Sequence, residues 1–379
     1  MENKIKNFGN SINLLIAGEN FTREQTRDLF SEILLGEQTE IHQGAFLAAI
    51  TAKGPDPREI AGAWQAIYEL DTVKVSPNTE KPLVDNCGTG MDSFKTFNIS
   101  TCSAIVAAAG GTCLARHGAR AITSRCGTVD LCETLGVDVE CPSDMVKESI
   151  EKTGIGLFNG MSSNTHPQAL FRILSQMSFG SILNIAASLA NPANPRLGVR
   201  GVYAKEMIGP VIQTMKEIGF KRALAFHGTS GNGIGGIDEL SPVGKSYVAE
   251  LKPDGNIVHY TVDPNSLGLM NTITLKDIAA RNDPREEARR LLRLFTGMDK
   301  GPLYETICLN TAPIFYVTKQ VDTLQKGVEK ARDIIDSGQA MDKLWQWVQT
   351  QNRNPHAGVD NLKALLDTMY TTFKSKWKF

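Results

Sequence analysis

From residue 82 onward the chain alternates short apolar runs that contain glycine with longer helical patterns. The runs are LVDNCGTG (83–90), SAIVAAAGGTCLARHG (103–118), GVRGVYA (198–204) and RALAFHG (222–228). Parallel strands need a long crossover between them, which is usually a helix, so this alternation predicts a mainly parallel sheet flanked by helices. The main fold class is therefore α/β.

The first 75 residues have a different pattern and predict helices. Thr22 and Gln25 fit a capping box, and the apolar residues 29, 30, 33 and 34 then fall on one helical face. The apolar segment 168–190 is helical again, and we expect it to pack back onto the N-terminal helices. Near the C-terminus, residues 322–349 and 359–376 predict amphipathic helices.

Composition excludes several classes of protein. Forty Lys and Arg balance 41 Asp and Glu, so no bulk field steers the chain toward nucleic acid or an anionic membrane. The seven cysteines form no CxxC pair and no zinc-type cluster, which is typical of reduced thiols in the cytoplasm. The N-terminus lacks a secretory pattern, and no run of about 18 apolar residues predicts a membrane span.

The stretch FHGTSGNGIGGIDELSPVGKS (226–246) contains a GxGxxG pattern and ends in GKS. A dinucleotide site needs a helix after its glycines, but Pro242 follows too closely, and Glu239 stands where a phosphate-binding loop needs glycine. We therefore expect no nucleotide site here. The adjacent carboxylates of Asp238 and Glu239 suit Mg²⁺, and an exposed acidic turn is the alternative.

A second stretch, DNCGTGMDSFKTFNIST (85–101), has the character of a phosphate site. Glycines let the backbone approach a phosphate closely, while hydroxyl and amide groups supply neutral donors. Its candidate residues are Gly88, Thr89, Gly90, Asp92, Thr96, Asn98, Ser100 and Thr101. The last two stand where a helical pattern begins, so a phosphate would meet free N–H groups there. The alternative is a glycine turn followed by Ser100 as a helix N-cap.

The third stretch, ARHGARAITSRCGTVDL (115–131), gathers positive charge in a near-neutral protein. Arg116, Arg120 and Arg125 lie close to His117 in the sequence. Such a set predicts a phosphate-binding patch, or alternatively a solvated surface.

Together these stretches resemble the anthranilate phosphoribosyltransferase family. The family's GTGGD-xxx-TFNIST is GTGMD-SFK-TFNIST here, KHGNR-xxSS-xxGSAD is RHGAR-AITS-RCGTVD, and GxDELSPxG is GIDELSPVG. The resemblance extends over about residues 10–346. It implies a small helical-bundle domain (1–79 and about 168–195) beside a larger α/β domain (80–167 and 196–379) with a C-terminal helical extension. It also implies a homodimer formed through the helical domain.

The resemblance further implies a reaction. Family members transfer the phosphoribosyl group of phosphoribosyl pyrophosphate (PRPP) to an aromatic amine and release pyrophosphate. By the resemblance, the candidate residues of the second stretch, together with Arg116 and Thr128, bind PRPP. Ser100, Asp238 and Glu239 bind Mg²⁺, and the glycine loop 229–235 is expected to close over PRPP.

The acceptor pocket implied by the family comprises His117, Gly118, Ala119, His166 and Arg172. Here the sequence departs from the family pattern: Ala119 replaces an asparagine, while Leu174 and Gly180 replace two arginines. Arg116 replaces a lysine and keeps its charge. A buried carboxylate without a cation is costly, so we expect either an anthranilate-type acceptor in an altered pocket or another aromatic amine.

Two alternative functions stay open. Pyrimidine nucleoside phosphorylases share the fold and a similar KHG run, although GTG-x-D and TFNIST favour the transferase. A non-catalytic relative that binds nucleic acid is the other alternative, and the balanced charge of the chain argues against it.

Overall fold

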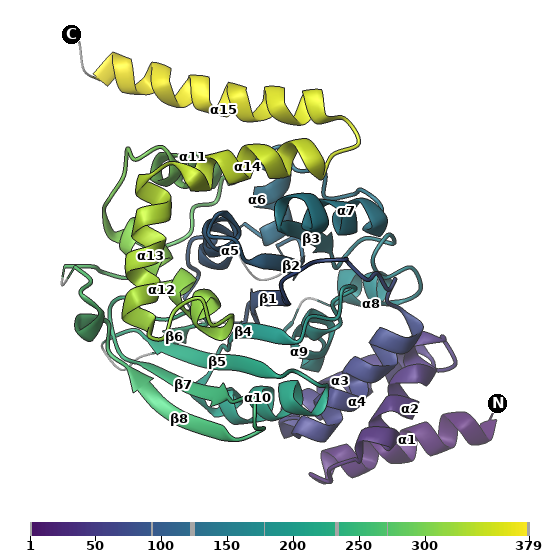
Figure 1. Cartoon of the computed structure of the whole chain (residues 1–379). Coiled ribbons are helices and arrows are strands. Elements are labelled where there is room, and N and C mark those ends of the chain that lie inside the picture. The colour runs from purple at the N-terminus through teal and green to yellow at the C-terminus, as the bar shows by residue number, and fades with distance from the viewer. Residues whose placement is uncertain are drawn as a thin grey trace.

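The computed structural model describes residues 2–91, 94–121, 126–177, 179–231, 235–270 and 272–376. Within these residues one sheet runs through the larger part of the molecule (Figure 1). Its strands are β1 (Leu83–Gly88), β2 (Cys113–Gly118), β3 (Ile155–Asn159), β4 (Leu197–Gly201), β5 (Arg222–Thr229), β6 (Gly236–Ile237), β7 (Ser246–Leu251) and β8 (Ile257–Val262).

The strand order is β3-β2-β1-β4-β5-β7-β8, and β6 pairs with β5. The five strands from β3 to β5 are parallel, whereas β6, β7 and β8 join antiparallel. The predicted α/β class with a mainly parallel sheet is confirmed. Because the carboxyl ends of parallel strands meet at one edge, the loops after β1 and β2 lie together there.

Helices cover both faces of the sheet because its residues alternate between two cores. In β5, Leu224 and Phe226 belong to one core, while Ala223 and Ala225 belong to the other. The helices that contribute to the first core are α5 (Ile99–Ala109), α6 (Thr128–Thr134), α11 (Pro284–Phe295), α12 (Pro302–Val317), α13 (Leu324–Asp336), α14 (Gln339–Thr350) and α15 (Pro355–Lys376). Strand β5 is therefore buried on both sides.

The second core joins the N-terminal helices to the sheet. Its helices are α1 (Glu2–Ile16), α2 (Arg23–Leu34), α3 (Glu40–Lys53), α4 (Pro57–Leu70), α8 (Leu170–Gln176), α9 (Ile182–Leu189) and α10 (Ile208–Glu217). The predicted capping box is present, since Thr22 and Gln25 each accept a hydrogen bond from the other's backbone N–H. Helix α7 (Ser143–Thr153) completes a smaller third core against β2 and β3.

The segment 226–246 forms a hairpin instead of a nucleotide cradle. Strand β5 ends at Thr229, and Gly236 begins β6, which pairs back onto β5. The described residues 235–246 contain no helix, and Ser246 of the GKS sequence begins β7. This arrangement differs from the strand–glycine–helix order of a dinucleotide site, and the absence of nucleotide binding here stays a prediction.

The C-terminal region differs from its predicted pattern. Residues 322–349 hold two helices, α13 and α14, because Gly338 between them is left-handed with φ of 80°. Helix α15 then crosses the outside of the molecule (Figure 1). Between α14 and α15, the Gln351 side chain accepts from Leu157 N and donates to Leu157 O, both at 2.9 Å. This amide therefore pairs with the free edge of β3 as a further strand would.

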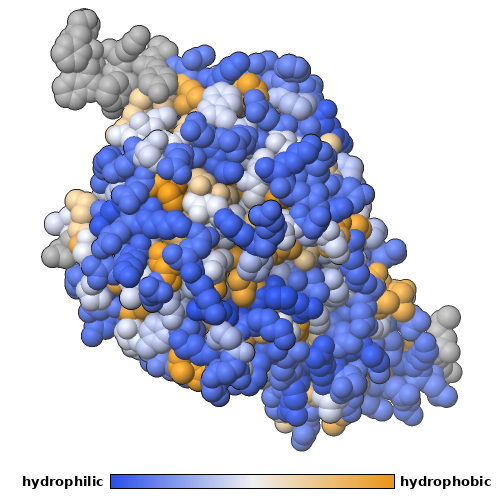
Figure 2. All heavy atoms as spheres, viewed as in Figure 1, coloured by the Kyte–Doolittle hydropathy of each residue, from blue (hydrophilic) through white to orange (hydrophobic). Residues whose placement is uncertain are grey.

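The described surface is mostly hydrophilic on the face that Figure 2 presents, with apolar residues scattered across it. Among the described helices, none combines the length and the apolar character that a membrane crossing requires.

Candidate active site

A cavity of about 1140 Å³, including the open solvent at its mouth, lies where the loops after β1, β2 and β5 meet. Its lining has two halves of different chemistry. The first half comprises Cys87, Gly88, Thr89, Gly90, Lys95, Thr96, Phe97, Asn98, Ile99, Ser100, Cys126, Gly127, Thr128, Asp238 and Glu239. The second comprises His117, Gly118, Ala119, Arg120, Gly160, Leu174, Leu183, Asn184, Ala187 and Ser188. We name the first the donor half and the second the acceptor half, after the phosphoribosyl donor and the amine acceptor that the family resemblance implies; the names do not refer to hydrogen bonds.

The loop after β1 is built against Asp238. The Gly90 N–H donates to Asp238 Oδ2 at 2.7 Å, and Gly90 itself is left-handed with φ of 70°. A Cβ atom at Gly88 would lie 2.3 Å from the same carboxylate oxygen. Both glycines are thus required, one for its backbone conformation and one for the close approach of the carboxylate.

Asp238 and Glu239 are both only 8% exposed, so the alternative of an exposed acidic turn is wrong. Burial raises the pKa of the Asp238 carboxyl, although the Gly90 N–H and the nearby Lys95 oppose that shift. Ser100 and Glu239 also border a second, smaller cavity together. All three predicted metal ligands therefore line the donor half.

The N-terminus of α5 also faces the donor half. Asn98 occupies the N-cap position, so the alternative that Ser100 is the N-cap is wrong. The Asn98 side chain donates to Cys126 O at 3.2 Å and makes no cap hydrogen bond. The first-turn N–H groups near Ser100 are consequently not capped by Asn98, and the positive end of the helix points at the cavity.

Arg116 and Thr101 lie behind the loop instead of in the cavity lining. The Arg116 guanidinium is 1% exposed and donates to Asn86 Oδ1 at 3.1 Å, Thr101 Oγ1 at 2.8 Å and Ser100 Oγ at 3.2 Å. In this structure neither side chain lines the cavity, and direct phosphate contact from these two residues stays a prediction. Arg116 ties β2 to β1 and α5, because its planar fork reaches both at once.

Helices α8 and α9 supply three aliphatic side chains and two polar residues, Asn184 and Ser188, to the acceptor half. Leu174, Leu183 and Ala187 come from these helices, and Ala119 follows β2. His117 lines the same space but is buried. Burial lowers the pKa of His117 to about 3, helped by the neighbouring His166, so this imidazole is neutral at pH 7.

Two predicted acceptor residues lie off the cavity lining. His166 is buried behind His117, with their Nε2 atoms 3.1 Å apart. Arg172 lies on α8, where Leu174 faces the cavity in its place. Residues two apart on a helix point in different directions, which explains the difference. Asp92, Arg125 and residues 232–234 of the glycine loop lie outside the described residues.

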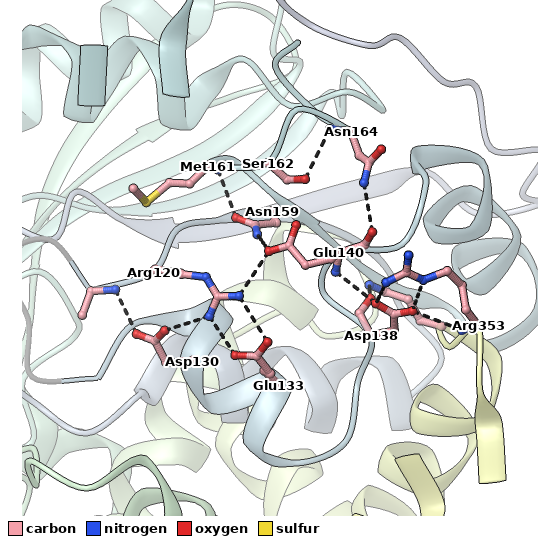
Figure 3. Close-up of polar contacts among 12 residues, drawn as sticks. Arg120, Asp130, Glu133, Asp138, Glu140, Asn159, Met161, Ser162, Asn164 and Arg353 are labelled. Atoms are coloured by element: carbon pink, nitrogen blue, oxygen red, sulfur yellow. Dashed lines mark hydrogen bonds and ion pairs between the residues drawn. The ribbon is translucent and has the colours of Figure 1, made fainter. Parts of the chain in front are cut away.

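Arg120, at the rim of the acceptor half, is surrounded by carboxylates (Figure 3). It pairs with Asp130 at 3.3 Å, Glu133 at 2.7 Å and Glu140 at 3.1 Å. Glu140 Oε1 also accepts from Asn159 Nδ2 at 2.8 Å. The predicted cationic set is thus divided, since Arg116 is buried in a scaffold and Arg120 is neutralised by acidic partners.

Sequence reasoning left several contributors to the site out of its candidate residues, among them Asn86, Leu183 and Ser188. Asn86 holds Arg116 and also donates to Ser100 O at 2.8 Å, while Leu183 and Ser188 line the acceptor half. The signal for Asn86 was available, because it is a polar residue at the end of an apolar strand beside the glycine loop. Leu183 and Ser188 lie in an apolar helix, where nothing in the sequence distinguishes cavity from core.

Comparison with known proteins agrees with this geometry. The sequence matches the glycosyl transferase family, α/β domain, over residues 80–341, and its helical bundle domain over residues 10–70. It is 36% identical to the anthranilate phosphoribosyltransferase of Methanosarcina acetivorans, over 89% of this chain and 88% of that protein. The enzyme of Clostridium beijerinckii is 33% identical, over 88% of this chain and 95% of its own length.

Solved structures give the same result. The crystal structure of anthranilate phosphoribosyltransferase from Thermus thermophilus superposes with a TM-score of 0.79 at 31% identity, covering 90% of this chain and 98% of that one. The enzyme from Saccharomyces cerevisiae in complex with PRPP and Mg shares the fold, with a TM-score of 0.74 at 24% identity over 87% of this chain and 93% of that one. The chain therefore belongs to the glycosyl transferase family and, within it, to the anthranilate phosphoribosyltransferases.

Proposed function

We propose that this enzyme transfers the 5-phosphoribosyl group of PRPP to an aromatic amine and releases pyrophosphate. The observation that carries the proposal is the division of one cavity into a donor half with buried carboxylates and a helix N-terminus, and an apolar acceptor half. A phosphorylated sugar and an aromatic ring are the two partners that such halves suit. The relatives' names support the same reaction.

Within the donor half we assign the phosphates and ribose to the residues that line it. These are Gly88, Thr89, Gly90, Thr96, Asn98, Ser100 and Thr128. Uncharged backbone and hydroxyl donors hold phosphate oxygens without neutralising them fully. Arg116 and Thr101 support this set from behind, and Arg116 adds a positive charge beneath the loop.

The residues at the end of the donor half fit Mg²⁺. Two buried carboxylates that line the same cavity as Ser100 form a concentration of negative charge that a hard cation would offset. In the described part of the chain no three His, Cys, Asp or Glu side chains converge into a metal cage, so phosphate oxygens and water would complete the coordination. When bound, Mg²⁺ neutralises charge on the departing pyrophosphate.

We infer an anthranilate-type acceptor, because the relatives are anthranilate phosphoribosyltransferases. Along α8 and α9 the acceptor half nevertheless carries aliphatic and uncharged polar residues and no cation, and its rim cation Arg120 already has three carboxylate partners. Such a pocket stabilises a ring more than a carboxylate. We therefore expect aromatic amines without a carboxylate to be accepted alongside anthranilate.

An assay with PRPP, Mg²⁺ and anthranilate tests the function. Loss of anthranilate fluorescence and release of pyrophosphate should proceed together, and aniline should release pyrophosphate as well. Phosphate with uridine or thymidine should give no cleavage. Pyrophosphate release with none of a panel of aromatic amines, despite calorimetric binding of Mg²⁺–PRPP, would refute the transferase proposal.

We also propose a homodimer formed through a helical domain of residues 1–79 and about 168–195, beside an α/β domain of 80–167 and 196–379. Support comes from four exposed large apolar side chains in or beside α1, α2 and α3, namely Leu14, Ile16, Leu35 and Ile41. Light scattering should give twice the mass of one 41.3 kDa chain, and Ile16→Asp with Ile41→Asp should halve it. An unchanged mass in that variant would contradict the interface.

Finally, we assign the enzyme to the cytoplasm. All seven cysteines of the sequence are free thiols, and burial raises the pKa of each of them, among them Cys126, Cys132 and Cys141, which keeps them protonated. Seven free thiols suit a reducing compartment. Titration of the unfolded protein without reductant should count seven thiols.

A further inference from the structure

Two buried histidines lie one behind the other at the acceptor half. His117, next to the last residue of β2, lines the cavity, whereas His166 lies behind it, in the segment that leads into α8. Their ring centroids are 5.1 Å apart and their Nε2 atoms 3.1 Å apart. Burial lowers the pKa of both imidazoles, so each carries one hydrogen at neutral pH.

The position of the hydrogen on His166 follows from its other neighbour. His166 Nδ1 lies 2.6 Å from the carbonyl oxygen of Asp71, which only accepts hydrogen bonds. A bare ring nitrogen at that distance would place two lone pairs against each other. Thr72 cannot supply the missing hydrogen, because its hydroxyl donates to Ile67 O at 3.0 Å. His166 therefore holds its hydrogen on Nδ1, and its Nε2 is bare.

The tautomer of His117 follows in turn. Since His166 Nε2 is bare, the 3.1 Å contact requires a hydrogen on His117 Nε2. His117 is neutral, so its Nδ1 carries a lone pair only. That atom lies 3.5 Å from the carbonyl oxygen of Ser188, a second acceptor. Two hydrogen-bond acceptors thus face each other with no hydrogen between them, and both residues line the cavity.

Hydrogen bonds to Asp71 fix the segment that carries His166, and with it the arrangement of donors and acceptors on the two imidazoles. The carboxylate of Asp71 accepts from the backbone N–H groups of Gln168 at 2.5 Å, Ala169 at 3.0 Å and Leu170 at 2.6 Å. Asp71 therefore anchors the N-terminus of α8 with its side chain and orients His166 with its carbonyl group. On the far side, a Cβ atom at Gly160 would lie 2.8 Å from His117 Nε2, so the backbone closes directly on the ring.

We propose that His117 Nδ1 and the Ser188 carbonyl oxygen receive the N–H groups of the acceptor amine, and that His166 is a positioning residue that fixes the tautomer of His117. The inference rests on the proposed function, since it requires an amine in the acceptor half. An aromatic amine has two N–H donors, and holding both leaves its nitrogen lone pair directed away from these acceptors. The pair thus orients the nucleophile without removing a proton from it.

The test is nitrogen NMR of the whole enzyme with its histidine rings labelled with nitrogen-15. We expect a bare Nδ1 on His117 and a hydrogen-bearing Nδ1 on His166. His227 is the internal reference, because its Nδ1 lies 2.8 Å from Val202 O and should also carry hydrogen. A hydrogen on His117 Nδ1, or a charged His117 at pH 7, would overturn the inference whether or not the enzyme transfers phosphoribose.

Ligand titration adds a second readout. Anthranilate and aniline should both move the His117 Nδ1 resonance toward that of a hydrogen-bonded nitrogen, whereas benzoate, which lacks the amine, should not. The His227 resonance should stay in place. An equal shift with benzoate, or no shift with either amine, counts against the inference.

Variants of His166 separate positioning from a merely structural role. His166→Phe removes the acceptor of the His117 Nε2 hydrogen, so that hydrogen should move to Nδ1 and bond to Ser188 O. We expect the KM for the amine to rise about tenfold with an unchanged KM for PRPP. His166→Gln keeps an oxygen acceptor near the same place and should recover most of the loss. Equal kinetics in the two variants would overturn the role given to His166, and absence of transfer in the wild type would refute the proposed function alone.

Discussion

The donor and acceptor halves of the cavity share one set of strand ends but handle charge in opposite ways. The donor half buries Asp238 and Glu239 beside a helix N-terminus, with the Arg116 guanidinium beneath it. The acceptor half combines the aliphatic side chains of Leu174, Leu183 and Ala187 with a neutral imidazole, the uncharged polar residues Asn184 and Ser188, and one cation, Arg120, at its rim. The polar half retains charges at a cost in folding free energy, whereas the apolar half retains almost none.

That difference matches the two tasks of the proposed reaction. A departing pyrophosphate gains charge in the transition state, so fixed charges and a cation there lower the barrier. An aromatic amine is already a nucleophile near pH 7 and needs orientation more than activation. The charged groups of the cavity therefore lie where the leaving pyrophosphate would bind, and the groups that orient the amine lie where the nucleophile would bind.

The largest effect should come from removing the buried carboxylates. Asp238→Asn with Glu239→Gln should lower kcat/KM about a thousandfold, because the proposed cation loses its protein ligands. Calorimetry should show weaker Mg²⁺–PRPP binding, and aromatic amine binding should persist. Asp254→Asn, on the exposed turn between β7 and β8, is the matched control. Activity near the wild-type level in the double variant would show that the charges of the donor half do not contribute to catalysis.

The next effect tests the fit between Gly88 and Asp238. Gly88→Ala would bring a Cβ atom to 2.3 Å from Asp238 Oδ2, so the carboxylate must move. We expect kcat/KM to fall about a hundredfold, mainly through the KM for PRPP. Gly209→Ala in α10, where a Cβ atom has nothing within 4 Å, should leave the kinetics unchanged. Similar behaviour of the two variants would show that Gly88 is not under steric constraint.

A third effect concerns stability beneath the donor half. Arg116→Lys keeps the charge but cannot reach Asn86, Thr101 and Ser100 together, which leaves buried polar groups unpaired. We expect the free energy of unfolding to fall by about 2 kcal/mol. Urea denaturation measures the change, and an equally stable variant would mean that the guanidinium fork is not needed.

A fourth effect is the pH dependence of the free energy of unfolding that the buried His117 of the acceptor half causes. The folded state depresses the pKa of His117 to about 3 from 6.5, so its stabilising contribution is present above pH 6.5 and is lost as the pH falls. Between pH 7.5 and 5.5 this histidine should cost about 1.4 kcal/mol of unfolding free energy. His117→Asn should lose less over the same interval. An identical loss in both proteins would show that His117 accepts protons normally.

The smallest effect should lie at the rim. Arg120 has three carboxylate partners, and Glu140→Gln removes the charge of one of them while Glu133 and Asp130 keep theirs (Figure 3). The guanidinium then keeps more of its positive charge uncompensated and can attract an anion in the cavity. We expect the KM for anthranilate to fall about threefold, because a partly exposed cation attracts its carboxylate weakly. The KM for aniline should not change. A similar change for both amines would attribute the effect to rim geometry instead of charge.

The sequence predicted local features well and long-range ones less well. The capping box at Thr22 follows from four consecutive residues, and the structure confirms it. The break at Gly338 also had a local signal, a Ser-Gly pair, but the continuous amphipathic pattern on both sides obscured it. Arg116 was assigned to PRPP because it replaces the lysine of the family motif and keeps its charge, yet it lies behind the cavity because β1 and α5 supply acceptors there.

What the amino-acid sequence determined by itself was the alternation of strands and helices and the motifs that identify the family, since both depend on residues near one another in the chain. The tertiary structure decided which polar residues face the cavity. His117 and His166 are 49 residues apart, and their tautomers depend on a carbonyl group of Asp71, which is 95 residues from His166. The folded state alone can fix the tautomers of these histidines, because burial removes the water molecules that would otherwise donate to or accept from each ring nitrogen.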